Sequence, residues 1–270
     1  MNKNCSLLPG LPLHGFAAWR EHRRATTCFL LLYQKYILLC MVFLVVSIPA
    51  AHSQRPLGSW NILNTKLNFN DHWSVWAEGQ LRSLQFYDEF TYYEVKGGAT
   101  YSLKQHVAFT LGIGHYQTFT SGGNFEQPTV TEETRTWFQM VLEQKLDWIN
   151  FEHRYRVEQR HISTGYKNRF RYRLNVVVPI NHKEVIPKTL FAYIGDEVFF
   201  TNKTPFYERN RFSTGLGYKI SSVISVQSGY MRQFNYSPTP QSSHDYLQVA
   251  LYINFNSKDF KRQSIPSPAD

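Results

Sequence analysis

The first residues that could carry out catalysis are His161 and Ser163, which are separated by one position and have Asn168 nearby. A histidine that takes the proton of a serine hydroxyl, with a polar neighbour to orient it, makes the serine a nucleophile for ester hydrolysis. Outer-membrane phospholipases use a His-x-Ser arrangement of this kind. The rest of their pattern is missing here, so we interpret the pair as part of a solvated loop and keep lipid hydrolysis as an alternative function.

Arginine and glutamate form a second set that could do chemistry. Two carboxylates can act as general acid and base, and rows of arginine can attract anions along a pore. In this chain the carboxylates have arginines nearby, which favours ion pairing over both of those roles. We therefore predict a structural charge network and keep an anion-attracting pore lining as its alternative. Its members are Arg135, Glu143, Glu152, Arg154, Arg156, Glu158, Arg160, Arg169, Arg171, Arg173, Glu197, Arg209 and Arg211.

The sequence shows no pattern typical of a cofactor or metal site. The histidines lack metal-ligand spacing, and the glycines Gly112 and Gly114 lie inside a strand-like stretch instead of a phosphate-binding loop. All three cysteines, Cys5, Cys28 and Cys40, fall within the first 53 residues. We therefore expect no cofactor, no metal and no disulfide in the chain that follows those residues.

The charged residues of the network lie two positions apart, with aromatic or aliphatic residues between them. Side chains of a β-strand alternate between two faces, so residues 151–160 and 169–174 predict paired strands with one charged face. Similar alternation recurs along the chain and predicts about eleven strands of roughly 11 to 14 residues. Because bacterial outer-membrane barrels have even strand counts, we expect 10 or 12. Short and long connections are expected at opposite ends.

The first 53 residues resemble an export signal. Residues 36–48 are almost continuously apolar, Lys35 precedes them, and small residues follow up to Ser53. About 13 apolar residues are too few for a membrane-spanning helix, which favours a secretory signal cleaved after Ser53. We predict a leader over 1–53, a barrel over 54–256 and a polar tail over 257–270. Export, and the mixing of Glu with Arg despite a net charge of +9, disfavour a nucleic-acid partner.

Alternation alone leaves open which face points inward. In a soluble barrel the apolar face would form the core, whereas in a membrane barrel it would contact lipid. Aromatic residues near the predicted strand ends, and glycines on the charged face, favour the membrane arrangement. The predicted fold is all-β: an antiparallel up-and-down transmembrane barrel of about 10–12 strands, with a polar lumen filled by Arg and Glu.

Several motifs resemble a known family. They are Glu133-x-Arg135-x-Trp137, the block from His153 to Arg160, the Arg169–Arg173 repeat, Arg209-Asn210-Arg211 and Gly229-Tyr230. Together they are similar to the domain-of-unknown-function family numbered 2490, whose members are exported proteins found mainly in Bacteroidetes-type bacteria. The resemblance implies an outer-membrane-type barrel and carries no established activity or catalytic residues.

We therefore expect an integral outer-membrane protein, either structural or a narrow conduit for small solutes or ions, without catalytic activity. Its expected partners are outer-membrane lipid and the barrel-assembly machinery. The alternatives are a lipid hydrolase using Ser163 and His161, and a soluble periplasmic β-barrel that binds a ligand.

Overall fold

A computed structural model of the chain describes residues 56–104, 106–236 and 242–257. The predicted leader with its cleavage after Ser53, and the predicted tail beyond residue 257, lie outside these residues. Within them, no helix has the length and apolar character needed to cross a membrane.

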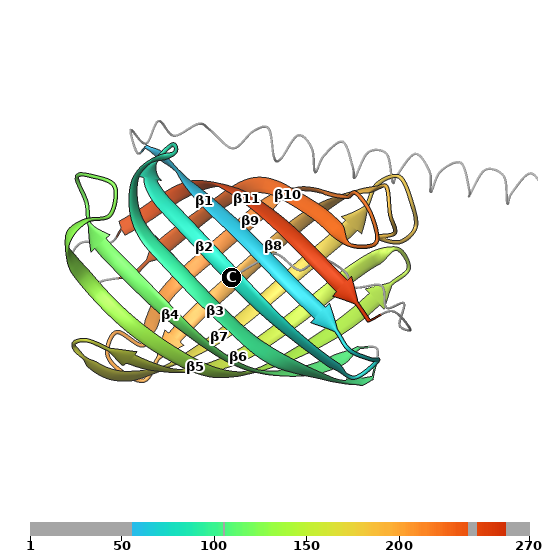
Figure 1. Cartoon of the computed structure of the whole chain (residues 1–270), viewed down its shortest axis with the longest axis horizontal. Helices are drawn as coiled ribbons and strands as arrows, with labels where there is room; N and C mark the ends of the chain where they lie inside the picture. The colour runs from blue at the N-terminus through green and yellow to red at the C-terminus, as the bar shows by residue number, and fades with distance from the viewer. Residues whose placement is uncertain (1–55, 105, 237–241, 258–270) are drawn as a thin grey trace, which may run out of the picture. The chain divides into compact units, whose positions relative to one another are not determined.

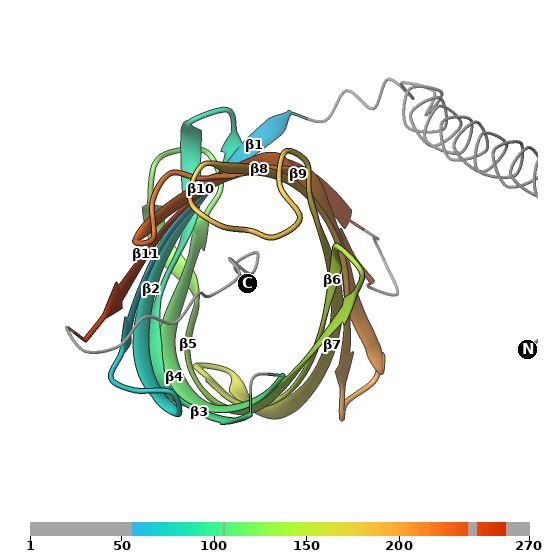
Figure 2. The ribbon, with the colours of Figure 1, turned by 90° about the vertical axis from the view of Figure 1, so that its right-hand side faces the viewer.

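The described part of the chain folds into eleven β-strands that close into one barrel (Figures 1 and 2). Each strand pairs with the strands before and after it in the sequence, so the order around the barrel is the order along the chain. The strands are β1 (Leu57–Asn68), β2 (Trp73–Gln85), β3 (Asp88–Lys104), β4 (Val107–Thr120), β5 (Glu126–Leu146), β6 (Ile149–Ile162), β7 (Gly165–Pro179), β8 (Thr189–Thr201), β9 (Tyr207–Lys219), β10 (Ile224–Asn235) and β11 (Ser242–Asn256). The predicted all-β barrel of about 10–12 strands is confirmed.

The barrel closes between β1 and β11, and this pair is parallel. Its register runs from Leu57 opposite Asp245 to Asn68 opposite Asn256. Strands in an up-and-down barrel alternate in direction, so with eleven strands the first and the last run the same way and can pair only in parallel. The expectation of an even count with fully antiparallel pairing is therefore wrong. The parallel ladder still pairs both backbone edges, so closure is complete.

The faces of the strands are oriented as a polar lumen requires. Along β8, buried residues alternate with partly or fully exposed ones throughout. Large apolar side chains point outward, with exposed fractions of 66% for Leu111 and 60% for Val95, whereas Glu158 is fully buried and Arg169 is 2% exposed. Apolar groups thus cover the outer surface, and ionic groups fill the interior.

Glycines on the inner face make room for aromatic rings. A Cβ atom built on Gly112 would lie 2.3 Å from the ring of Trp137, and one built on Gly217 would lie 2.2 Å from the ring of Phe191. Each ring therefore occupies the space that a side chain on the next strand would need. This contact explains why small residues share a face with long charged ones.

The two ends of the barrel differ in how they are covered. We call the end where β1 finishes the first end and the end where β1 begins the second end. The longest connection among the described residues, 180–188, arches into the opening of the first end (Figure 2). Its Val185 is buried with Val177, Phe191 and Tyr193, and its carbonyl oxygen accepts a hydrogen bond of 3.2 Å from Lys219 Nζ.

The expected separation of short and long connections is not found. The connections 69–72, 147–148 and 220–223 are short and lie at the first end, as predicted. The long connection 180–188 joins β7 to β8 at that same end. The alternation pattern of the strands does not predict where this loop lies, because the loop is held in place by packing against lumen side chains.

Candidate functional site

The ionic side chains of the lumen gather toward the second end. On β7 the buried residues run from Arg169, Arg171 and Arg173 near the second end to Asn175 and Val177 near the first. We call this region the charged half. Among the described residues it holds twelve cations and seven carboxylates: Arg82, Lys96, Arg135, Arg154, Arg156, Arg160, Lys167, Arg169, Arg171, Arg173, Arg209 and Arg211, with Glu78, Glu94, Glu133, Glu152, Glu158, Glu197 and Glu208.

Glu158 on β6 is one centre of the network. Its carboxylate lies 2.6 Å from Arg171 Nη1, 3.4 Å from Arg169 Nη1 and 3.6 Å from Arg156 Nη1. Pairing between β6 and β7 places Glu158 beside Arg169 and Arg156 beside Arg171. The strand register that sequence alternation predicts therefore brings these charges together directly.

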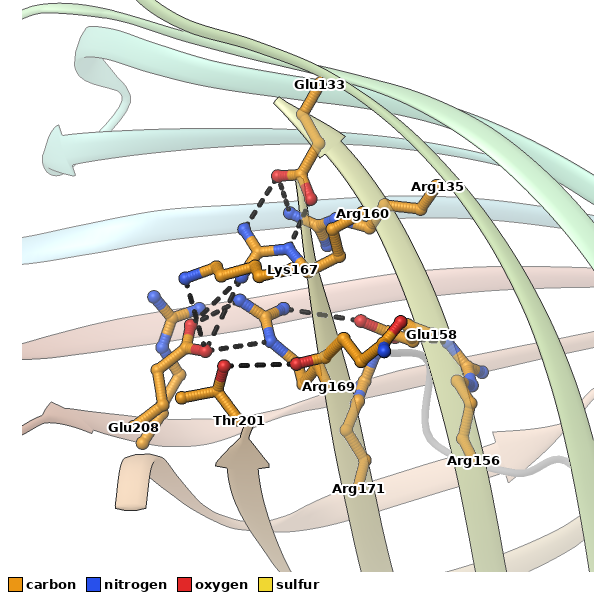
Figure 3. A network of polar contacts seen from close by, with 12 residues as sticks. Glu133, Arg135, Arg156, Glu158, Arg160, Lys167, Arg169, Arg171, Thr201 and Glu208 are labelled. Carbon is orange, nitrogen blue, oxygen red and sulfur yellow. Dashed lines mark hydrogen bonds and ion pairs between the residues drawn. The ribbon is translucent and has the colours of Figure 1, made fainter. Parts of the chain in front are cut away.

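A chain of ion pairs continues from Glu158 toward the barrel wall at β5 and β9 (Figure 3). Arg160 forms two hydrogen bonds with Glu133 and lies 3.2 Å from Glu208 Oε1. Arg169 also donates to Glu208, so this carboxylate joins two arginines from neighbouring strands. Such forked contacts from arginine to carboxylate are the strong kind of ion pair, because two parallel bonds fix both groups.

Glu197 on β8 is a second centre, deeper along the barrel. Its Oε1 accepts hydrogen bonds from Arg154 Nη2 at 2.6 Å and from Arg171 Nε at 3.0 Å. Arg173 donates to Glu152 at 2.8 Å. All these groups are buried or nearly so, and removing an ion from water is costly unless an opposite charge and further hydrogen bonds replace the water.

Sequence reasoning missed Glu208, although it is central to the network. Phe199 on β8 pairs with Arg209, while the next residue, Phe200, pairs with Tyr207, so Glu208 has no partner in this ladder. An extra residue of this kind is a β-bulge, which redirects a side chain. Strict alternation places Glu208 on the face opposite Arg209, and only the bulge brings both side chains into the lumen.

A smaller cluster on β2 and β3 was also not predicted as part of the network. Lys96 Nζ lies 2.8 Å from Glu78 and 2.6 Å from Glu94, and Arg82 Nη2 lies 3.1 Å from Glu94. The hydroxyl of Tyr92 also donates to Glu94. Alternation placed these residues on the polar face, but it gave no sign that they pair with one another.

The predicted network members differ in their surroundings. Glu143 on β5 is exposed and pairs in register with Glu152 on β6. Arg135 donates to Glu133 at 2.7 Å and stacks 3.7 Å from the ring centre of Tyr116. Arg209 and Arg211 on β9 instead meet neutral oxygen acceptors, as described below.

The two candidates for catalysis, His161 and Ser163, lie at the end of β6 and in the turn that follows it. His161 is exposed at the end of β6, and its ring lies 5.0 Å from that of Tyr166. Ser163 lies in the turn before β7, where its backbone N–H donates to the carbonyl oxygen of Glu132. The structure, over the part of the chain that it describes, shows no hydrogen bond between the two side chains. It also contains no group of three or more His, Cys, Asp or Glu residues arranged to hold a metal ion.

The arrangement of a closed barrel with a buried Arg and Glu network can be compared with known proteins. Residues 57–244 match the family described as "Protein of unknown function (DUF2490)". The chain belongs to this family. In this DUF2490 protein the match covers β1 to β10 completely and ends inside β11. The comparisons found no matching curated protein and no matching solved structure.

Proposed function

We propose that this DUF2490 protein is an integral outer-membrane β-barrel. The observation that carries the proposal is the inversion of polarity: ionic groups fill the interior, and apolar groups cover the outside. A surface of exposed apolar side chains such as Val95, Leu111 and Ile113 is unfavourable in water and favourable against hydrocarbon. Because every strand pairs on both sides, the backbone also satisfies its hydrogen bonds without water.

The distribution of aromatic residues supports a membrane position. Exposed aromatic side chains occur at both ends of the barrel, as in the girdles that lie at the two lipid–water boundaries. They include Phe69, Trp73 and Trp148 at the first end, and Phe86, Tyr87, Phe206 and Tyr236 at the second.

The lumen is filled rather than open. Chains of ion pairs cross its charged half, and the 180–188 connection enters its first end. We therefore assign the barrel a structural role, or the role of a conduit for ions and very small solutes, without a catalytic step. Large solutes have no path through such an interior.

Cell fractionation tests the membrane proposal. The protein should stay in the outer-membrane fraction after washes with high salt and with alkaline carbonate, and detergent should release it. Recovery in the soluble periplasmic fraction without detergent would instead favour the soluble barrel.

Conductance in planar lipid bilayers tests the filled lumen. Purified protein should give either no channels or steps far smaller than those of a general porin measured in the same membrane. Steps as large as those of the porin would contradict a lumen closed by ion pairs.

A further inference from the structure

Counted over the residues that the structure describes, the charged half of the lumen has more cations than carboxylates. Its twelve cations face seven carboxylates, and most of the ion pairs of these carboxylates are with the arginines of β6 and β7 and the cations of β2 and β3. Excess charge in a protein interior is unfavourable unless a counter-ion accompanies it. The position of the least compensated cations therefore indicates where an anion would bind.

Arg209 and Arg211 on β9 are those cations. Arg209 Nε donates to the amide oxygen of Asn235 at 2.6 Å, and no carboxylate in the described ranges lies within ion-pair distance of its guanidinium group. Arg211 Nε donates to the amide oxygen of Gln233 at 2.9 Å, and its nearest carboxylate, Glu197, is 4.0 Å away. The hydrogen-bond acceptors of both arginines are therefore neutral, and they do not balance the positive charge of the two guanidinium groups.

A third guanidinium group, from Arg82, lies near that of Arg211. The two groups lie 3.6 Å and 4.9 Å from the centre of the Trp60 ring, so a cation of β2 and a cation of β9 both contact this residue of β1. Arg82 is 7% exposed, and its Nε donates to no acceptor in the part of the chain that the structure describes. Arg209 is half-buried and lies near the start of β9, so solvent from the second end reaches it.

We propose that Arg82, Arg209 and Arg211 bind a small soluble oxyanion inside the barrel, such as inorganic phosphate or a carboxylate. The planar fork of arginine matches the paired oxygens of both ligands. The three side chains face the lumen, whereas lipid contacts only the outer face, so the ligand comes from solution and not from a lipid headgroup. The site goes beyond the proposed function, since it does not depend on where the barrel resides.

Calorimetric titration of the purified barrel with inorganic phosphate at low ionic strength tests the site. The wild type should bind saturably, and R209Q/R211Q should bind roughly a hundredfold more weakly, since each of the two lost charged hydrogen bonds weakens affinity by about tenfold. R232Q is the matched control: Arg232 pairs with Phe212 in the adjacent register but is exposed on the outer face, so phosphate binding should be unchanged.

Gln233→Glu provides a test that does not remove a buried cation. A carboxylate at the position that now accepts from Arg211 would act as an internal counter-ion. This variant should melt at a higher temperature than wild type without phosphate, and its melting temperature should no longer rise when phosphate is added.

Two further ligands separate specific binding from general screening. Succinate, run beside phosphate, shows which oxyanion the site prefers, and stabilisation by either one supports the site. Sodium chloride at equal ionic strength should have little effect. The proposal is overturned if the wild type shows no saturable response to either oxyanion, if chloride stabilises it equally, or if Gln233→Glu responds to phosphate as the wild type does.

Discussion

At the scale of single residues, the interior depends on a few carboxylates that each serve several arginines. Glu158 is the clearest case, because it is fully buried and lies within ion-pair distance of Arg156, Arg169 and Arg171. Breaking such a centre leaves several buried charges without a partner, and the cost of that loss exceeds the net stabilisation that the pairs provide.

We expect E158Q to destabilise the barrel by about 3–5 kcal/mol, the usual cost of removing one partner from a buried ion pair. Urea-induced unfolding in detergent or lipid, followed by tryptophan fluorescence, measures this free energy. E132Q is the matched control on β5, since Glu132 is exposed and its only described ion pair is a 3.8 Å contact with His115. Equal stability of E158Q and wild type would contradict a structural role for this carboxylate.

Residue types and spacing predicted only part of this network. Arg154, Arg156 and Glu158 were placed correctly because the period of a strand is fixed by its backbone. Glu208 was not, because a bulge changes the period and has no signal in the surrounding residues. The pairing of Arg82 with Glu94 was missed for another reason: it depends on the register between β2 and β3, which the turn between them sets.

At the scale of elements, neighbouring strands fit together by placing rings over glycines. Phe191 on β8 occupies the space beside Gly217 on β9, and Trp137 on β5 occupies the space beside Gly112 on β4. These contacts join adjacent strands independently of their hydrogen bonds. They also explain why glycines occur among the long side chains of the polar face.

G217A should destabilise the barrel by about 1–3 kcal/mol, because a methyl group there collides with the ring of Phe191. G79A is the control, since a Cβ atom on Gly79 meets no atom within 4 Å. Adding F191L to G217A should recover part of the loss, which a double-mutant cycle of unfolding free energies would show. Independent, additive effects of the two substitutions would contradict the contact.

At the scale of the whole molecule, closure by a parallel pair of strands distinguishes this barrel from the even-numbered arrangement that its sequence led us to expect. Counting alternating stretches predicted about the right number of strands. It could not decide parity, because closure depends on contacts between the two most distant strands of the chain.

Cysteine cross-linking tests this closure. Leu63 and Leu251 are exposed partners in the parallel register, so L63C/L251C should form a disulfide on mild oxidation. L63C/F255C, offset by four positions along β11, should stay reduced. Because the native cysteines Cys5, Cys28 and Cys40 all precede residue 54, a chain beginning there has no competing thiol. Cross-linking of the offset pair alone would contradict the register.

The parallel pairing of β1 and β11 also places the start and the finish of the barrel at opposite ends. β1 starts at the second end, and β11 finishes at the first, whereas an even-stranded barrel starts and finishes at one end (Figure 1). If the barrel spans a membrane, epitopes attached just before Leu57 and just after Asn256 would therefore be displayed in different compartments. Antibody labelling of intact cells would detect one epitope and miss the other, and so reveal whether the first or the second end of the barrel faces the outside of the cell.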